Sequence, residues 1–243
     1  MNKVYVVGLG PGAGNQMTIQ AAEVLERCSL IVGYMVYVDL IREQFPDKQY
    51  RTTPMKQEVK RCQIALSEAE KGLEVAMICS GDAGVYGMAG LMYEVGQSFP
   101  TVEIEIVPGI TAAIGAAAIL GAPLMHDFAV ISLSDLLTPL DKIEMRIEMA
   151  AIADLVICLY NPSSKKRYDY LKRACKIMLS HKREDTICGI VRNIRRREEM
   201  SKIITLRELM DTEVDMFTTV IVGNEETIEK NGKMITPRGY KDV

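Results

Sequence analysis

Short runs of small and turn-forming residues recur where four predicted strands end. They lie at residues 8–14, 80–86, 108–112 and 160–162. In open α/β sheets, ligands bind in the crevice at the carboxyl ends of the strands. Glycine has no Cβ and therefore lets another backbone or a ligand approach closely. We expect these loops to form a binding site for a small ligand.

Asp82 is the one acidic residue in these four runs. Its carboxylate has two possible roles. It either holds a polar ligand group or a cation, or it hydrogen-bonds the neighbouring backbone as a turn or helix cap. The sequence leaves both roles open.

The first loop also matches the dinucleotide fingerprint G-x-G-x-x-G/A, with Gly8, Gly10 and Ala13 after a predicted strand. A nicotinamide-dependent oxidoreductase is therefore an alternative, but three features weaken it. Pro11 removes a backbone donor from the loop, the next helix starts only near Thr18, and no acidic residue ends the second strand to bind a ribose hydroxyl. A tight turn that binds no ligand is the remaining alternative for this loop.

Apolar, β-rich runs alternate with helical patterns along the chain, which is typical of an α/β fold. We predict strands at 3–8, 30–33, 74–79, 103–107, 127–132, 155–160, 186–192, 201–205 and 217–223. We predict helices at 18–28, 57–71, 87–98, 111–120, 139–153 and 167–181. Thr18 is expected to cap the first helix, and Thr138 is expected to cap a helix whose first residue is Pro139.

The pattern changes after Gly109, where we place a domain boundary. The pattern of residues 1–109 predicts βαβα units with a mainly parallel sheet. Residues 110–243 contain closely spaced strands, which predict a mixed sheet. We expect two α/β domains with the ligand in a cleft between them.

Composition excludes several classes of protein. The 243 residues carry a net charge of −3, which argues against binding to nucleic acid or to an anionic membrane surface. No apolar run approaches the roughly 18 residues of a membrane span, and no signal peptide precedes the first strand, so we expect a cytoplasmic protein. The six cysteines form no CxxC pair and no metal-ligand spacing. They are expected to be buried free thiols, with no bound metal.

Three runs together resemble the tetrapyrrole methylase family, the class III S-adenosylmethionine-dependent methyltransferases. They are GLGPG at 8–12, SGDAGVY at 80–86 and PGITA at 108–112. Their order and spacing carry the resemblance, which covers nearly the whole chain. Four longer runs are similar to the branch that methylates C17 of precorrin-3B or cobalt-factor III and contracts the ring in cobalamin biosynthesis. These runs are 80–89, 121–128, 131–139 and 236–240, and Ala83 stands where many relatives have proline.

The resemblance implies that S-adenosylmethionine binds between the two domains and leaves as S-adenosylhomocysteine. The positions that match the family's donor contacts are Pro11, Gly81, Asp82, Ala83, Tyr86, Thr111, Ala112, Tyr160, Asn161, Val191, Arg192, Thr218 and Thr236. The resemblance also implies a homodimer. Because the sequence continues only briefly beyond Tyr240, we expect no C-terminal extension and no iron–sulfur cluster.

Ring contraction requires a proton to move, so a general acid or base near the macrocycle is expected. We expect Asp135 first in this role, then His126 and Ser132. The alternatives are that Asp135 only orients its loop and that His126 is a hydrogen-bonded residue at a strand edge.

The substrate of such an enzyme carries many carboxylates, and arginine offers them a bidentate partner. We expect some of the following arginines to face the cleft: Arg51, Arg146, Arg167, Arg192, Arg195 and Arg238.

Two further functions are alternatives to C17 methylation. One is another methylase of the same fold, acting at C11, at C20, on uroporphyrinogen or in diphthamide synthesis. The other is a tetrapyrrole carrier without catalytic activity. The absence of extra domains favours a cobalt-containing substrate over a metal-free one.

Overall fold

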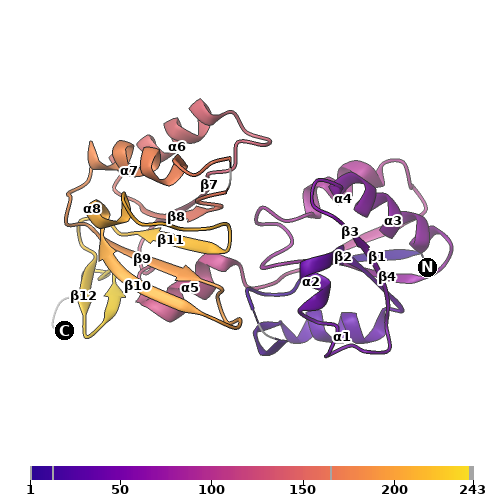
Figure 1. The fold of residues 1–243 in the computed structure, drawn as a ribbon. Coiled ribbons are helices and arrows are strands. Elements are labelled where there is room, and N and C mark those ends of the chain that lie inside the picture. The colour runs from indigo at the N-terminus through magenta and orange to yellow at the C-terminus, as the bar shows by residue number, and fades with distance from the viewer. Residues whose placement is uncertain (1, 13, 165, 241–243) are drawn as a thin grey trace. The chain divides into compact units, whose positions relative to one another are not determined.

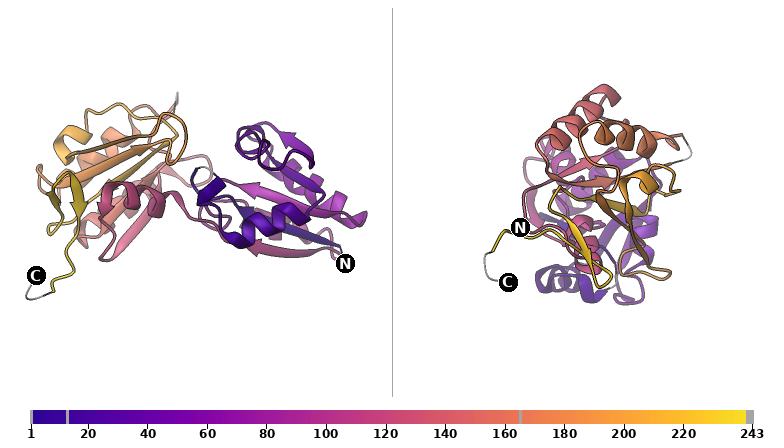
Figure 2. Two further views of the ribbon diagram at one scale, coloured as in Figure 1. Left: turned by 90° about the horizontal axis from the view of Figure 1, so that it is seen from below. Right: turned by 90° about the vertical axis from the view of Figure 1, so that its left-hand side faces the viewer.

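The structure is a computed structural model that describes residues 2–12, 14–164 and 166–240. The chain divides into two compact units, Met1–Ala112 and Ala113–Val243 (Figure 1). The boundary expected after Gly109 lies close to this division. Figure 2 shows the units from two further directions, with the first in indigo to magenta and the second in magenta to yellow.

The first unit contains a five-stranded sheet in the order β3-β2-β4-β1-β5, and every described pair in it is parallel. The strands are β1 (Lys3–Gly8), β2 (Leu30–Tyr34), β3 (Gln49–Thr53), β4 (Glu74–Cys79) and β5 (Glu103–Val107). The helices are η1 (Gly14–Gln16), α1 (Ile19–Arg27), α2 (Met35–Asp39), α3 (Glu58–Glu70) and α4 (Ala89–Gly96). The predicted parallel sheet is confirmed.

Helices cover both faces of this sheet, as Figure 1 shows. Val6 of β1 lies in the core shared with α3 and α4, whereas its neighbour Val7 lies in the core shared with α1 and α2. Because both faces are buried, the central strands are continuous apolar runs instead of alternating ones. Thr18 caps α1 as predicted, since its hydroxyl accepts a hydrogen bond from the backbone N–H of Ala21 at 3.1 Å.

The second unit contains a mixed sheet in the order β10-β9-β11-β8-β7, in which only β7 and β8 run parallel. Its strands are β7 (Phe128–Ser132), β8 (Val156–Tyr160), β9 (Ile187–Arg192), β10 (Met200–Thr205) and β11 (Thr218–Val222). The helices α6 (Leu140–Ile152), α7 (Tyr170–Leu179) and α8 (Leu206–Leu209) share one core with this sheet. On the other face, Leu120 of α5 (Ala112–Leu120) packs against Gly189. A small sheet joins β6 (Gly121–Ala122), β12 (Ile228–Lys230) and β13 (Lys233–Ile235).

Several short elements were not predicted. They are η1, α2, β3, β6, α8, β12 and β13. The edge strand β3 reads QYRTT, and only its last residue, Thr53, is buried, so it lacks the apolar pattern of the central strands. The remaining elements are too short to show a period of their own.

Two predicted helix starts are wrong. Pro139 is the N-cap of α6 and not its first residue, and no side chain caps this helix end. The helix expected from residue 167 begins at Tyr170. The intervening residues instead form turns, because the backbone N–H of Arg167 donates to the carbonyl of Ser164 at 2.9 Å.

All six cysteines are buried and free, as predicted. In the part of the chain that the structure describes, no helix has the length and apolar character of a membrane span. Within those same residues, no three metal-ligating side chains come together.

Candidate functional site

Three loops of the first unit meet at the carboxyl ends of β1, β4 and β5. A Cβ on Gly109 would lie 2.2 Å from the carbonyl oxygen of Gly81 and 2.6 Å from that of Gly8. A Cβ on Gly8 would lie 2.7 Å from the backbone nitrogen of Gly109. Both positions therefore require glycine, because a Cβ would clash with the backbone of a neighbouring loop. The predicted convergence of these loops follows from the order of the strands in the sheet.

Asp82 ties two of these loops together. Its Oδ1 accepts the backbone N–H groups of Gly84 at 2.8 Å and Val85 at 3.0 Å, and its Oδ2 accepts that of Gly109 at 2.9 Å. Of the two roles open in the sequence, the described contacts show the turn-capping one. The hydrogen bond from Gly109 to Asp82 also joins the turn after β5, and the sequence did not indicate this contact.

The first loop does not have the geometry of a dinucleotide site. The backbone N–H of Gly10 donates to Gly81 at 3.0 Å, and that of Gly81 donates back to Gly10 at 2.8 Å. The long helix after the loop begins only at Ile19, so the loop does not lead directly into a helix N-terminus that could receive a pyrophosphate. Ala13, the last position of the fingerprint, lies outside the described residues.

The structure brings the family-matched positions of the first unit into one region. Pro11 is buried beside Gly10, which is paired with Gly81. A Cβ on Gly81 would lie 3.7 Å from both the Thr111 Cα and the Ala112 nitrogen, so the second loop lies against the start of α5.

The remaining two positions, Ala83 and Tyr86, belong to the loop after β4. Ala83 is fully buried, and its carbonyl accepts the N–H of Ala89 at 3.0 Å. Tyr86 is exposed and has a φ of 54°, which is uncommon for a residue other than glycine. A strained, exposed residue beside a fixed loop is consistent with a ligand contact.

In the second unit, four of the predicted residues share one edge of the mixed sheet. Ser132 ends β7 and lies opposite Tyr160, which ends β8. Arg192 ends β9 and lies opposite Thr218, which begins the antiparallel strand β11. The Tyr160 hydroxyl accepts the backbone N–H of Ala113 at 2.6 Å, which fixes the first turn of α5 against this edge.

Arg192 is held by an acidic neighbour that the sequence did not indicate. Its Nε donates to Asp215 Oδ2 at 2.7 Å, and the Thr218 hydroxyl donates to Asp215 Oδ1 at 2.8 Å. Burial opposes ionisation of Asp215, but these hydrogen bonds outweigh it and lower the pKa of its carboxyl. The three side chains line a cavity of about 330 Å³.

Val191 and Thr236 are fully buried. The Thr236 hydroxyl lies 2.8 Å from that of Thr227, and its N–H donates to Ala122 at 3.1 Å. Both polar groups of Thr236 are therefore engaged within the small sheet and its loop. This placement gives no support to the expected ligand contact of Thr236.

Asp135 lies three residues beyond β7 and is hydrogen-bonded by two side chains. Tyr170 donates to its Oδ2 at 2.8 Å, and Arg167 donates to its Oδ1 at 3.3 Å. The Tyr170 hydrogen bond and the Arg167 guanidinium lower the pKa of Asp135. The side chain is therefore ionised at neutral pH, which suits a base or a charge-stabilising group and not a general acid.

Ser132 and Asn161 are joined at the same edge. Ser132 Oγ accepts the Nδ2 amide of Asn161 at 3.0 Å and the N–H of Ser134 at 3.2 Å. Asn161 has a positive φ of 52°, which turns the chain sharply after β8. The pair holds together the loops that follow β7 and β8.

His126 does not join this group. It precedes β7, whereas Ser132 ends that strand and Asp135 follows it. Its Nδ1 accepts the backbone N–H of Asp127 at 3.0 Å. The structure therefore places His126 at the opposite end of β7 from Ser132 and Asp135, and its expected acid–base role stays a prediction. Spacing along a strand could have shown this, because the two ends of a strand lie at opposite edges of the sheet.

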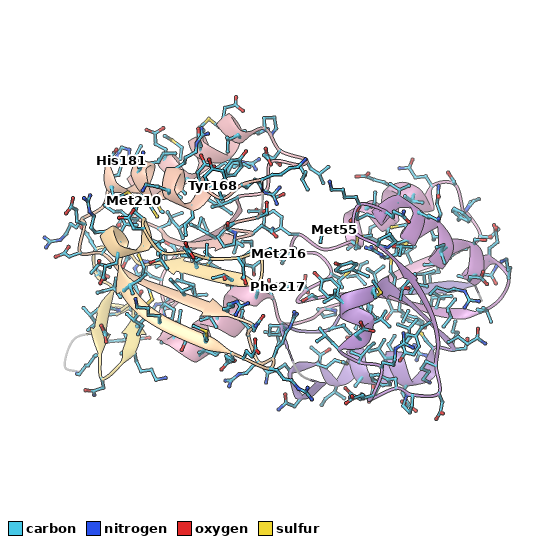
Figure 3. The ribbon with its side chains drawn as sticks, viewed as in Figure 1. Met55, Tyr168, His181, Met210, Met216 and Phe217 are labelled. Atoms are coloured by element: carbon cyan, nitrogen blue, oxygen red, sulfur yellow. The ribbon has the colours of Figure 1, made fainter. Side chains whose placement is uncertain are left out.

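Exposed apolar side chains lie on the loops after β7, after β8 and before β11, at the same end of the mixed sheet as Asp135. They are Leu136, Leu137, Tyr168, Met216 and Phe217, and we call them the apolar rim. Figure 3 labels Tyr168 before α7 and Met216 and Phe217 at the start of β11. Leu137 is 98% exposed and Tyr168 is 81% exposed, and a group of exposed apolar side chains marks a surface that can bind a ligand. The sequence analysis placed Tyr168 in a helix and Phe217 in a strand, and therefore did not indicate that either side chain is exposed.

Two of the six arginines expected to meet carboxylates, Arg167 and Arg192, lie at this edge with the hydrogen bonds described above. The other four, Arg51, Arg146, Arg195 and Arg238, are exposed. The expected cleft between the two units remains a prediction.

Comparison with known proteins gives a consistent result. The model of the tetrapyrrole (corrin/porphyrin) methylases matches residues 3–210. A probable cobalt-factor III C17-methyltransferase of Salmonella typhimurium is 48% identical over 97% of this chain and 98% of its own. A precorrin-3B C17-methyltransferase of a Sinorhizobium species is 38% identical over 98% of this chain and 96% of its own. The crystal structure of the methyltransferase CobJ superposes with a TM-score of 0.88 at 36% identity, covering 96% of this chain and 99% of that one. Some relatives are longer, and the chain spans 45% of one and 53% of another.

Proposed function

The chain belongs to the family of tetrapyrrole (corrin/porphyrin) methylases, and from this premise we propose that it methylates C17 of cobalt-factor III with S-adenosylmethionine and contracts the ring. The relative from Salmonella typhimurium supports this substrate, because it is 48% identical over nearly the full length of both chains. The relative named for the metal-free substrate, precorrin-3B, is 38% identical. The difference favours the cobalt-containing ring, and precorrin-3B is the second candidate.

The observation that carries this proposal is the convergence of the glycine loops, fixed by the bond from Gly109 to Asp82. Gly81 and Ala112 carry at most a methyl group there. Such a surface suits an adenosyl ligand, which has hydrogen-bonding groups at both ends and needs close backbone approach. The loops therefore fit the methyl donor. The family resemblance further leads us to propose Pro11, Asp82, Ala83, Tyr86 and Thr111 as donor-site residues of the first unit. For the second unit it leads us to propose Tyr160, Asn161, Val191, Arg192, Thr218 and Thr236.

When bound, S-adenosylmethionine supplies an electrophilic methyl group on a sulfonium. The S–CH₃ bond breaks with its electron pair on sulfur, and a macrocycle carbon supplies the pair of the new C–C bond. The macrocycle then carries the positive charge that the sulfonium has lost. Orientation of two reactants contributes up to about 7–11 kcal/mol to such a reaction. This explains a site made of fixed backbone and small residues.

The second unit supplies features that a tetrapyrrole needs. The apolar rim offers exposed apolar surface for a flat ring, and Arg167 and Arg192 offer cations for its carboxylates. Asp135, held as an anion, lies within this group. We propose that it acts on the positively charged macrocycle, with Ser132 fixing the loop on which it stands.

Two finer expectations belong to this proposal. We propose that the protein acts in the cytoplasm, in keeping with six buried free thiols. We also propose that it acts as a homodimer, which the family resemblance implies. Sedimentation of the purified protein tests the second point.

The test begins with calorimetric titration of the purified protein with S-adenosylmethionine, S-adenosylhomocysteine and NADH. We expect binding of both adenosyl ligands and no response to NADH, since the Gly10 amide is already bonded to Gly81. Turnover is then measured with cobalt-factor III and with precorrin-3B, following the added methyl group by mass and the contracted ring by its absorption spectrum. Binding of NADH alone, or methylation at another ring position, would overturn the proposal.

A further inference from the structure

Three side chains from different segments meet beyond the carboxyl end of β7. Asp135 stands on the loop after β7, Arg167 on the loop after β8, and Tyr170 at the start of α7. The Tyr170 hydroxyl donates to Asp135 Oδ2 at 2.8 Å and Arg167 donates to Oδ1 at 3.3 Å. The Asp135 side chain is 35% exposed and that of Arg167 is 14% exposed, so the carboxylate is open to a ligand on one side and bonded on the other.

The charged side chains near Asp135 include two arginines, and only Arg167 of the two is paired with Asp135 in the described structure. On α7, the guanidinium of Arg173 lies 6.0 Å from the Tyr170 ring centre, and its charge is balanced by Glu144 of α6 at 2.7 Å. Asp169 adjoins Tyr170 and acts on it electrostatically. Arg167 is thus the cation paired directly with Asp135, while the Arg173–Glu144 pair is internally neutral.

We propose that Tyr170 is a positioning residue that, together with Arg167, holds the Asp135 carboxylate as a fixed anion against the macrocycle. This inference rests on the proposed function. A carboxylate has about four acceptor positions, and the described side-chain bonds occupy one on each oxygen. A backbone hydrogen bond adds to them, and the exposed part of the carboxylate is the part that can meet the substrate.

The chemistry explains why a fixed anion is useful. Methyl transfer leaves the macrocycle with one additional positive charge, and a preoriented negative group stabilises charge that develops during a reaction. A protonated Asp135 would not do so. The Tyr170 hydroxyl fixes one carboxylate oxygen and stabilises the charged form, so that Asp135 stays ionised to lower pH. The same bond raises the pKa of Tyr170 itself.

If the role of Tyr170 were purely structural, the effect of removing its hydroxyl on the pH dependence of activity would differ. If Tyr170 only fastened α7 to the loop after β7, its loss would lower stability and reduce activity equally at every pH. If it holds Asp135 ionised, its loss makes Asp135 easier to protonate. The acid limb of the activity profile then moves to higher pH while activity at high pH recovers.

The experiment compares Tyr170→Phe with Tyr93→Phe, which removes a hydroxyl from a half-exposed tyrosine on α4 far from this cluster in sequence. The kcat of product formation is measured from about pH 2.5 to 9, a range that extends below the ordinary carboxyl pKa because that of Asp135 is lowered. We expect the acid limb to move upward by about one pH unit in Tyr170→Phe, with KM nearly unchanged, and to stay in place in Tyr93→Phe. Asp135→Asn should remove the limb.

A second measurement needs no substrate. The ¹³C carboxyl resonance of Asp135, identified by its loss in Asp135→Asn, should titrate at higher pH in Tyr170→Phe than in the wild type. Superimposable titrations, or a fall in kcat that is equal at every pH, would overturn the role of Tyr170. A wild-type protein that methylates neither tetrapyrrole overturns the proposed function instead, so the two failures are distinguishable.

Discussion

The Asp82 carboxylate accepts the backbone N–H of Gly109 at 2.9 Å, across 27 residues of sequence. One side chain thereby joins the loop after β4 to the turn after β5. The other carboxylate oxygen of Asp82 accepts two backbone N–H groups of its own loop. The loops of the proposed donor site are therefore fixed relative to one another before a ligand arrives.

Asp82→Asn should weaken ligand binding while leaving the fold intact. Asparagine replaces one acceptor oxygen with an NH₂ donor, which then faces a backbone N–H. Hydrogen bonds to a charged group contribute about 1.5–3 kcal/mol, so affinity for S-adenosylhomocysteine should fall about tenfold to a hundredfold. Calorimetric titration measures it, with Asp47→Asn on an exposed loop as the control. An unchanged dissociation constant would contradict this account.

Gly109→Ala should destabilise the first unit severely. Its Cβ would lie 2.2 Å from a backbone oxygen that cannot rotate away, so we expect a loss above the usual overpacking cost of about 1–3 kcal/mol. Gly90→Ala is the matched control, because nothing lies within 4 Å of its Cβ on α4. Alanine favours a helix over glycine by about 0.5–1 kcal/mol. Thermal melting should show opposite shifts for the two variants, and equal shifts would refute the contact.

Tyr160→Phe should leave the buried N–H of Ala113 without the acceptor it has at 2.6 Å. An unsatisfied buried donor costs about 1–3 kcal/mol. We expect a loss in that range for unfolding of the second unit in urea. Tyr93→Phe, on an exposed face of α4, should change little. Equal stability of the two variants would show that the Ala113 bond contributes nothing.

The six thiols should be unreactive in the native protein. Burial raises the pKa of Cys28, Cys79, Cys158 and Cys175 to about 12 and that of Cys62 to about 11, and it raises that of Cys188 as well. Only the thiolate is nucleophilic, so a thiol reagent at pH 8 should label none of them until denaturant is added. Rapid labelling of a native thiol would contradict their burial.

The same shifts predict how stability depends on high pH. Unfolded cysteine has a pKa of about 8.5, so above that value the unfolded chain loses protons that the folded chain keeps. The stabilisation is complete below the unfolded pKa and declines as pH rises towards the folded values near 12. Urea unfolding at pH 7.5 and at pH 10 should show lower stability at pH 10. Replacing Cys79 with alanine should reduce that difference.

The parallel sheet and the convergence of its loops could be predicted from the amino-acid sequence. Because β1, β4 and β5 are parallel neighbours, their carboxyl ends lie on the same side of the sheet. Gly8, Gly81 and Gly109, which follow these ends, therefore come together. The burial of the cysteines followed from their apolar neighbours in the same way. These are consequences of local pattern and of connectivity, which a sequence displays directly.

The contacts between side chains from distant segments could not be predicted from the sequence. The Asp135–Tyr170 bond spans 35 residues, and no local pattern shows that the loops after β7 and β8 bring them within hydrogen-bonding distance. His126, close to Asp135 in sequence, lies at the other end of β7. Edge strand β3 was missed because its stability comes from pairing with β2 and not from an apolar face of its own. Periodicity reports which residues are buried, whereas hydrogen bonds between distant segments depend on angstrom-scale placement that only the packed chain sets.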